Sequence, residues 1–273
     1  LRAAFQFDKE NDPFQVIYQR APLPVTRLDW RDLSADHYQK QLTRLIEKDH
    51  LTDFDFSKAP LLRFTIIERP REGYDLLLTF HHILMDRWSS DLFWSEVRRS
   101  YAGHTLAQAT PYQAYLRYVR QQPSDASFWQ EYLRGFDAPT PLPAATAIQT
   151  HSGSATIKRA FSLEATQQLI TFVREQGLTI NTLFQAAWAV LLARYSRESD
   201  VLFGMVTSGR SAPVRGIESI IGLFINTLPM RVKLDDNATG LALLQQVAST
   251  QLELQQREHT PLMDVQHLSE VSG

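Results

Sequence analysis

Residues 76–89, LLLTFHHILMDRWS, are the most informative segment of this chain for predicting its fold. An apolar run ends in two adjacent histidines, His81 and His82, and an aspartate, Asp86, follows. A new amphipathic segment at residues 91–101 comes next. This order predicts a buried strand, a tight turn that carries polar groups, and a helix.

Alternation along the predicted strand separates the two histidines. Successive side chains of a strand point to opposite faces of the sheet. His82 therefore falls on the face of Leu78 and Phe80, and His81 on the face of Leu77 and Thr79. The two imidazoles cannot readily hold one substrate atom together, so we expect one to reach a site while the other packs behind it.

Composition limits the class of protein. A length of 273 residues is a prior for about two domains, and 44% hydrophobic residues are enough for a sizeable core. A net charge of −2 argues for neither a nucleic-acid partner nor an anionic membrane. The absence of cysteine excludes disulfides and a thiolate nucleophile and fits a cytoplasmic location. The sequence shows neither a signal peptide nor an apolar run of the ~18 residues that span a bilayer.

Strands and helices interleave throughout, so the predicted class is α/β (α+β). Strands are expected at residues 14–18, 25–28, 61–67, 74–82, 155–161, 201–206 and 225–232. Helices are expected after Ser34, at residues 91–101, 112–119 and 128–133, after Ser162 and Thr179, and at residues 240–257. Three prolines within residues 138–145 predict a semi-rigid linker, which divides the chain into residues 1–145 and 146–273.

A cation stands on an otherwise nearly apolar strand. If residues 61–67 and 74–82 pair as a hairpin, Arg63 lies in the same sheet as the histidines. A charged group in such a place needs a partner, and Asp86 is a candidate. The alternative is that Arg63 simply reaches the surface.

The histidine pair allows several chemistries. A neutral histidine at a strand end can act as a general base on an amine or hydroxyl, and its ordinary pKa of ~6.5 suits neutral pH. Both imidazoles could instead be structural. His81, His82 and Asp86 are also possible metal ligands, but opposite faces weaken that interpretation, and we expect no metal.

The ordered motifs resemble the condensation domains of nonribosomal peptide synthetases. The central stretch is similar to the family's HHxxxDG signature, and residues 1–5 to the end of its RHExLRTxF motif. Further matches are residues 112–115, the FWxxYL pattern at 128–133, the SGR pattern at 207–210, and IGxFxNTLP at 221–229. The resemblance covers essentially the whole chain. The chain lacks an initial methionine and looks cut, so we expect a fragment in which both lobes are incomplete.

The resemblance implies a fold and an activity. Family members have two chloramphenicol acetyltransferase-like lobes, arranged as a V-shaped pseudodimer around a tunnel. Donor and acceptor peptidyl carrier protein domains dock at opposite mouths, and their phosphopantetheine arms bring two thioesters together. The acceptor amine attacks the donor thioester and a peptide bond forms. The domain itself then binds no cofactor, and a neighbouring adenylation domain is implied.

The same resemblance assigns roles to residues. His82 is the tunnel histidine, as general base or as a positioner of the amine, while His81 and Asp86 are structural members of the motif. Asp86 would pair with an arginine, for which Arg2 and Arg63 are candidates. The order of Trp88 and Ser89 is that of condensation domains. The motif sequences resemble those of the subtype that joins two L-residues. Expected near the tunnel and the lobe interface are Ser208, Gly209, Arg210 and Asn226.

One position departs from the family pattern. The glycine after the motif aspartate is Arg87 here. If this position required a positive φ, arginine would cost about 1–2 kcal/mol. Two alternative functions therefore stay open: a non-catalytic module that docks carrier proteins, and a related acyltransferase that uses coenzyme A.

Overall fold

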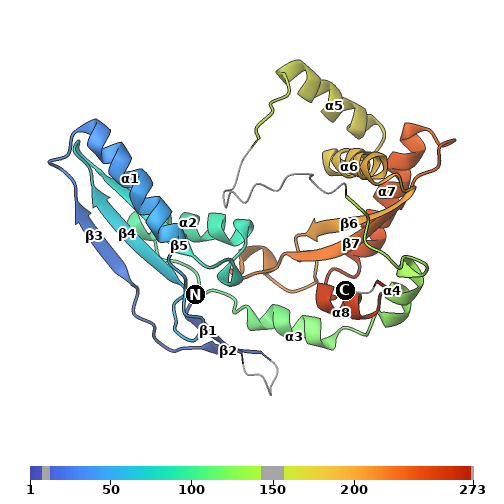
Figure 1. Ribbon diagram of the computed structural model, residues 1–273. Helices are drawn as coiled ribbons and strands as arrows, with labels where there is room; N and C mark the ends of the chain where they lie inside the picture. The colour runs from blue at the N-terminus through green and yellow to red at the C-terminus, as the bar shows by residue number, and fades with distance from the viewer. Residues whose placement is uncertain (8–12, 143–156, 272–273) are drawn as a thin grey trace. The chain divides into compact units, whose positions relative to one another are not determined.

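The computed structural model describes residues 1–7, 13–142 and 157–271, and these form two compact units (Figure 1). The first contains Leu1–Tyr112 and Ser219–Phe224, and the second contains Gln113–Glu218 and Ile225–Gly273. The mixed α/β class is confirmed, whereas the division predicted at about residue 145 differs from the one observed. Residues 143–145 of the predicted linker lie outside the described residues.

The first unit is built on a three-stranded sheet with the order β3-β4-β5. Its strands are β3 (Val25–Asp29), β4 (Leu62–Glu68) and β5 (Tyr74–Phe80). β3 runs parallel to β4, and β4 pairs antiparallel with β5, which confirms the predicted hairpin. A separate antiparallel pair consists of β1 (Ala3–Gln6), which the sequence did not predict, and β2 (Phe14–Ile17).

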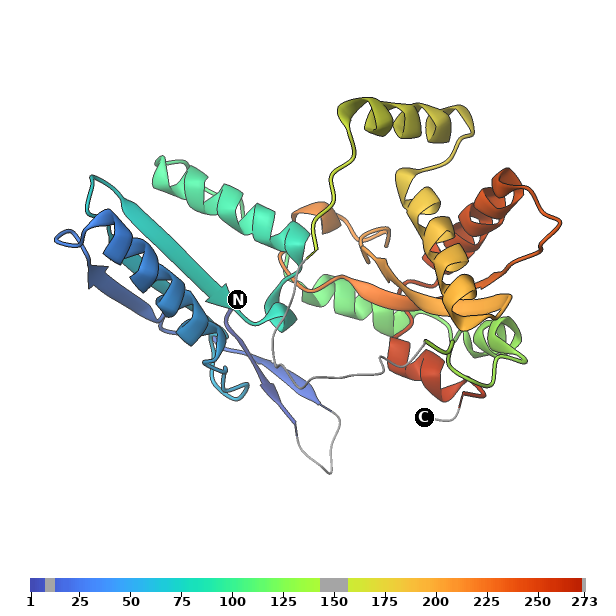
Figure 2. The same ribbon diagram turned by 45° about the horizontal axis from the view of Figure 1, so that its top comes forward.

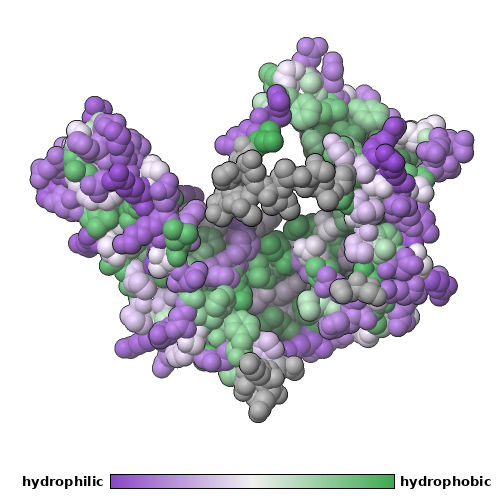
Figure 3. Space-filling model, viewed as in Figure 1, coloured by the Kyte–Doolittle hydropathy of each residue, from purple (hydrophilic) through white to green (hydrophobic). Residues whose placement is uncertain are grey.

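Two helices, α1 (Ala35–His50) and α2 (Arg87–Tyr101), cover opposite faces of the three-stranded sheet (Figure 2). On one face, Phe64 of β4 stacks on Phe93 of α2, with ring centroids 6.4 Å apart. On the other face, Thr79 of β5 donates a hydrogen bond to Asp49 near the end of α1. The outer surface of α1 is hydrophilic (Figure 3), as expected of a helix that buries only one side.

Arg63 finds its partner in α1. Its Nε donates to Asp49 Oδ1 at 2.7 Å, and its Nη2 donates to the Asp49 and Thr52 carbonyls at 2.7 and 3.0 Å. Burial raises the pKa of the Asp49 carboxyl, but hydrogen bonds from Arg63 and Thr79 outweigh burial and lower it overall. The prediction that Arg63 pairs with Asp86 is therefore wrong, because α1 covers the face on which Arg63 lies.

The second unit is built on one antiparallel strand pair with helices on both sides (Figures 1 and 2). The strands are β6 (Asp200–Thr207) and β7 (Asn226–Lys233). On one side lie α6 (Ile180–Ser196) and α7 (Gly240–Gln255), and on the other α4 (Ala126–Leu133) and α8 (Leu262–His267). The unit also contains α3 (Gln113–Gln121) and α5 (Leu163–Glu175). The strand predicted at residues 155–161 is wrong where it is described, since residues 157–161 are not in a strand.

Helix α4 explains why the division lies before residue 145. Its Trp129 is fully buried and its Leu133 is 4% exposed, in one core with residues of β6, β7, α6 and α7. The apolar side of α4 therefore belongs to the second unit, although the proline-rich segment follows it in the sequence.

The predicted helix starts at polar residues are confirmed. The side-chain oxygens of Ser34, Ser162 and Thr179 accept hydrogen bonds from backbone N–H groups in the first turns of α1, α5 and α6. Such caps satisfy donors that have no partner within the helix. Gly177, with a φ of 66°, ends α5 in the left-handed conformation that glycine adopts without strain.

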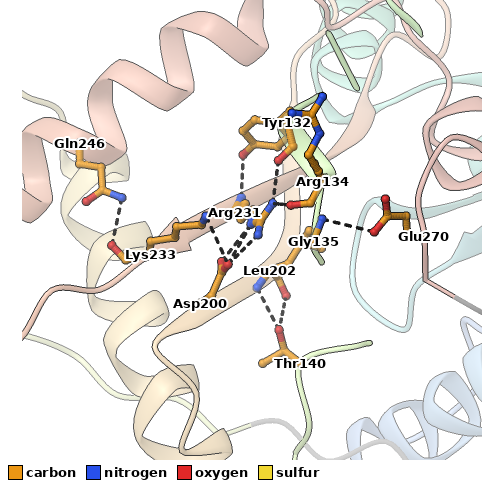
Figure 4. Close-up of polar contacts among 10 residues, drawn as sticks. All are labelled: Tyr132, Arg134, Gly135, Thr140, Asp200, Leu202, Arg231, Lys233, Gln246 and Glu270. Atoms are coloured by element: carbon orange, nitrogen blue, oxygen red, sulfur yellow. Dashed lines mark hydrogen bonds and ion pairs between the residues drawn. The ribbon is translucent and has the colours of Figure 1, made fainter. Parts of the chain in front are cut away.

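Arg231 of β7 binds the end of α4 and the residue that follows it to the strand pair (Figure 4). Its Nη2 lies 2.7 Å from Asp200 Oδ2, and its Nη1 donates to the carbonyls of Tyr132 and Arg134, both at 2.9 Å. The Tyr132 hydroxyl accepts from the Arg231 backbone N–H at 2.7 Å, and burial raises the pKa of Tyr132 to about 12. Thr140 continues the attachment, because its hydroxyl accepts from Leu202 N at 2.9 Å.

We predict that Arg231→Ala destabilises the second unit. The Arg231 side chain is only 8% exposed, and its loss leaves two carbonyls without their donor and Asp200 with the more distant Lys233, at 3.8 Å. The free energy of unfolding in urea should fall by about 3 kcal/mol, the lower end for breaking a buried pair, because Asp200 is partly solvated.

Arg134→Ala is the matched control for this prediction. The Arg134 side chain is 69% exposed and pairs with Glu131 on the surface, so its removal should cost less than about 1 kcal/mol. An equal loss in both variants would contradict the role given to Arg231.

Candidate functional site

The central stretch forms the turn between β5 and α2. β5 ends at Phe80, His81 has extended backbone, and a short 3₁₀ turn, η1 (His82–Leu84), follows. The prediction that the strand continues to His82 is wrong, so strand alternation does not set the direction of His82. The chain leaves the sheet because Ile83 N donates to the His81 side chain and Leu84 N donates to the His81 carbonyl.

His81 is held by the first unit. Its Nδ1 accepts from Ile83 N at 3.1 Å, which requires that Nδ1 carries no proton. Its ring lies edge-on to Phe56, with centroids 4.6 Å apart. Both contacts stabilise the turn, and they leave the imidazole of His81 engaged with protein.

His82 is exposed at the start of η1. Throughout the parts of the chain that the structure describes, no hydrogen bond or ion pair engages its imidazole. An unengaged ring at the end of a strand can accept a proton or a hydrogen bond from a ligand. The two adjacent histidines therefore have different surroundings, one packed and one presented.

Asp86 is a buried helix cap. It is 2% exposed, and its Oδ1 accepts from Ser89 N at 2.8 Å. Helix α2 therefore begins at Arg87, four residues before the start predicted at residue 91. The Oδ2 of Asp86 accepts from Phe224 N at 3.0 Å. Neither predicted arginine pairs with Asp86: Arg63 binds Asp49, and Arg2 donates to the carbonyl of Gln19.

Ser89 and Gly222 form a second, reciprocal attachment at the start of α2. The fully buried Ser89 hydroxyl donates to Gly222 O at 2.7 Å and accepts from Gly222 N at 3.0 Å. A Cβ at position 222 would lie 2.3 Å from the ring of Tyr112, so only glycine fits there. Segment Ser219–Phe224 is thus fixed on the histidine turn although more than 130 residues separate the two in sequence.

Arg87 is the first residue of α2 and points to solvent. Its side chain is 88% exposed, and its Nε lies 3.2 Å from Asp91 Oδ2, one helical turn ahead. Its backbone is helical, so the position does not need the freedom of glycine. The neighbouring Trp88 is 54% exposed.

The other predicted site residues lie in the second unit, at the ends of β6 and β7. Ser208 and Gly209 follow β6, and the guanidinium of Arg210 donates to Ile217 O at 2.6 Å. Asn226 begins β7, and its Nδ2 donates to the carbonyls of Glu258 and Thr260. Sequence reasoning missed Glu258 because an acidic residue just past a helix carries no local sign of a distant partner.

The described residues meet the requirements of neither a metal site nor a membrane-spanning helix. Residues 1–7, 13–142 and 157–271 contain no group of three His, Cys, Asp or Glu side chains placed to bind a metal ion. Over the same ranges, no helix combines the length and the apolar character needed to span a bilayer.

The chain belongs to the condensation domain family, whose model matches residues 1–273. It is similar to a linear gramicidin synthase of Brevibacillus parabrevis, with 36% identity over 281 residues. That alignment covers 99% of this chain but only 6% of the synthase, so the chain corresponds to a small part of its curated relative.

Solved structures share the fold. One is a four-domain nonribosomal peptide synthetase bound to AMP and glycine, with a TM-score of 0.77 and 24% identity over 98% of this chain and 21% of that one. Another is the X-domain from teicoplanin biosynthesis, with a TM-score of 0.73 and 24% identity over 100% of this chain and 63% of that one. These structures have the same fold as this member of the condensation domain family.

We predict that Asp86→Ala destabilises the first unit. The variant loses the cap of α2 and the acceptor for Phe224 N. A lost cap costs about 1 kcal/mol, and a lost hydrogen bond to a charged group about 1.5–3 kcal/mol, so unfolding in urea should become easier by about 3 kcal/mol.

Asp91→Ala, five residues along the same helix, controls for the loss of a carboxylate. Asp91 is 65% exposed and pairs with the solvent-exposed Arg87, so its removal should cost about 0.5 kcal/mol. Normal unfolding of Asp86→Ala would mean that its carboxylate is solvated.

Proposed function

We propose that the chain forms an amide bond between a donor aminoacyl or peptidyl thioester and an acceptor aminoacyl thioester. Membership of the condensation domain family supports this proposal. The observation that carries it is the division of roles in the turn: His81 and Asp86 are engaged in packing and capping, whereas His82 is presented. His81 and Asp86 thus fix the backbone of the turn on which His82 is exposed.

The proposed reaction is a nucleophilic acyl transfer. The acceptor nitrogen attacks the donor carbonyl carbon, the C–N bond forms, the C–S bond breaks, and the donor arm leaves as a thiol. The amine gives up one proton, and the leaving sulfur takes one up. A neutral His82 can accept the amine proton or orient the amine through a hydrogen bond.

The proposed partners are donor and acceptor carrier protein domains, with an adenylation domain nearby. Their phosphopantetheine arms would bring both thioesters, so this domain would need no cofactor of its own. The similarity to a gramicidin synthase many times longer than this chain supports such a multidomain setting. The exposed position of Arg87 favours catalysis over a purely docking function, because its side chain is solvated and its backbone is helical.

We predict that His82→Ala slows condensation in the intact synthetase by about 100-fold or more, the scale of acid–base catalysis. Product formation from preloaded carriers measures the rate, and loading of the carriers should not change. Unfolding should stay close to the parent, because His82 makes no side-chain hydrogen bond within the described residues.

His104→Ala removes another exposed histidine, in the loop after α2, and should keep the parent rate. If His82→Ala also condensed at the parent rate, the catalytic assignment of His82 would be wrong.

We predict that Arg87→Gly leaves the condensation rate close to that of the parent. The side chain it removes is solvated and bound to Asp91. The cost should be at most about 1 kcal/mol of stability, from the low helix propensity of glycine. The measurements are condensation rate and urea unfolding of both proteins. An inactive parent that glycine restores would instead identify the natural domain as a docking module.

A further inference from the structure

Glu258 is a buried carboxylate that none of the roles above explains. It lies three residues beyond the end of α7 and is 6% exposed. Burying a carboxylate is costly unless its oxygens accept hydrogen bonds. Its Oε2 accepts from Gly209 N at 3.2 Å, and its Oε1 accepts from Ser211 N at 3.0 Å and from the Ser211 hydroxyl.

The loop after β6 is shaped to bind this carboxylate. Gly209 has a φ of 63°, a left-handed conformation that a side chain would strain. That turn aims the N–H groups of Gly209 and Ser211 at one carboxylate, in the manner of the backbone nests that bind anions. Here the anion is part of the chain itself.

Glu258 is also tied to the start of β7. Its carbonyl accepts from Asn226 Nδ2 at 3.0 Å, and the same amide donates to Thr260 O at 2.6 Å. One residue therefore joins both motif segments of the second unit: residues 208–211 through its side chain and Asn226 through its backbone.

The loop and Glu258 border one cavity. Gly209 and Ser211, Glu258 and His259, and Tyr115 of α3 all line a cavity of about 540 Å³ in the second unit. The loop that Glu258 fixes is therefore a wall of a space large enough for a small molecule or part of one.

We infer that Glu258 is a positioning residue for the condensation reaction. It fixes the positions of residues 208–211 and Asn226 without touching the reacting atoms. This inference rests on the proposed function, and it takes the cavity that residues 209 and 211 border to hold part of a substrate. Misplacement of a site by about 1 Å can cost about 100-fold in rate, so a residue that acts only through backbone geometry can still limit turnover.

The test uses Glu258→Gln in the intact synthetase. Glutamine has the same shape but offers one oxygen where the loop needs two, and its amide group would face a backbone N–H. Single-turnover condensation from preloaded carriers separates two effects: loss of folded protein lowers the amplitude, whereas a misplaced loop lowers the rate constant. The rate constant should fall about 10-fold or more, and amide hydrogen exchange in peptides covering residues 208–211 should become faster.

Two variants serve as controls. Glu253→Gln makes the same chemical change at an exposed position of α7 and should behave as the parent. Glu258→Asp keeps the charge and both acceptors on a shorter stem, and should recover part of the rate and of the protection from exchange.

The outcomes separate this inference from the proposed function. Parent-like rate and exchange in Glu258→Gln, while His82→Ala is slow, would overturn the role of Glu258 alone. An inactive parent would overturn the proposed function, and the exchange experiment would still decide whether Glu258 holds the loop. If Glu258→Gln does not fold, Ser211→Ala takes its place, because it removes a single hydrogen bond. A parent-like rate constant and unchanged exchange in Ser211→Ala would then reject the inference.

Discussion

The carboxylate of Asp86 is the interaction on which the histidine turn depends. One oxygen starts α2 by accepting from Ser89 N, and the other holds Phe224 N. The same group therefore fixes the end of the turn and attaches a distant segment to it. A neutral side chain of similar size has fewer acceptors to share between two buried N–H groups, which gives a physical reason for an acid at this position.

Buried charges bound to the backbone recur in both units. Asp86 binds the amides of Ser89 and Phe224, Glu258 binds those of Gly209 and Ser211, and Arg231 binds the carbonyls of Tyr132 and Arg134. In each case a charged side chain satisfies polar backbone groups of loops or of helix ends. These contacts fix loops at defined positions, which apolar packing alone does not do.

The two histidines show how a motif separates structure from chemistry. His81 uses its Nδ1 to hold the turn and packs its ring on Phe56, so its imidazole has a structural role. His82 begins a 3₁₀ turn and stays exposed. Strand alternation predicted different surroundings for the two histidines, and their surroundings do differ. The reason was wrong, because β5 ends at Phe80, before both histidines.

The elements that could be predicted from the sequence are those that local chemistry controls. Periodicity located the β4–β5 hairpin, and Ser34, Ser162 and Thr179 marked the helix starts, because caps and amphipathic faces act within a few residues. The ordered motifs indicated the family. The partners of the buried charges became known from the folded structure: Asp49 for Arg63, Phe224 N for Asp86, and Gly209 and Ser211 for Glu258. The folded structure also shows that α4 belongs with the second unit. These pairs lie 14 to 138 residues apart, and charge alone does not specify which of many distant groups a side chain meets once helices and strands have packed.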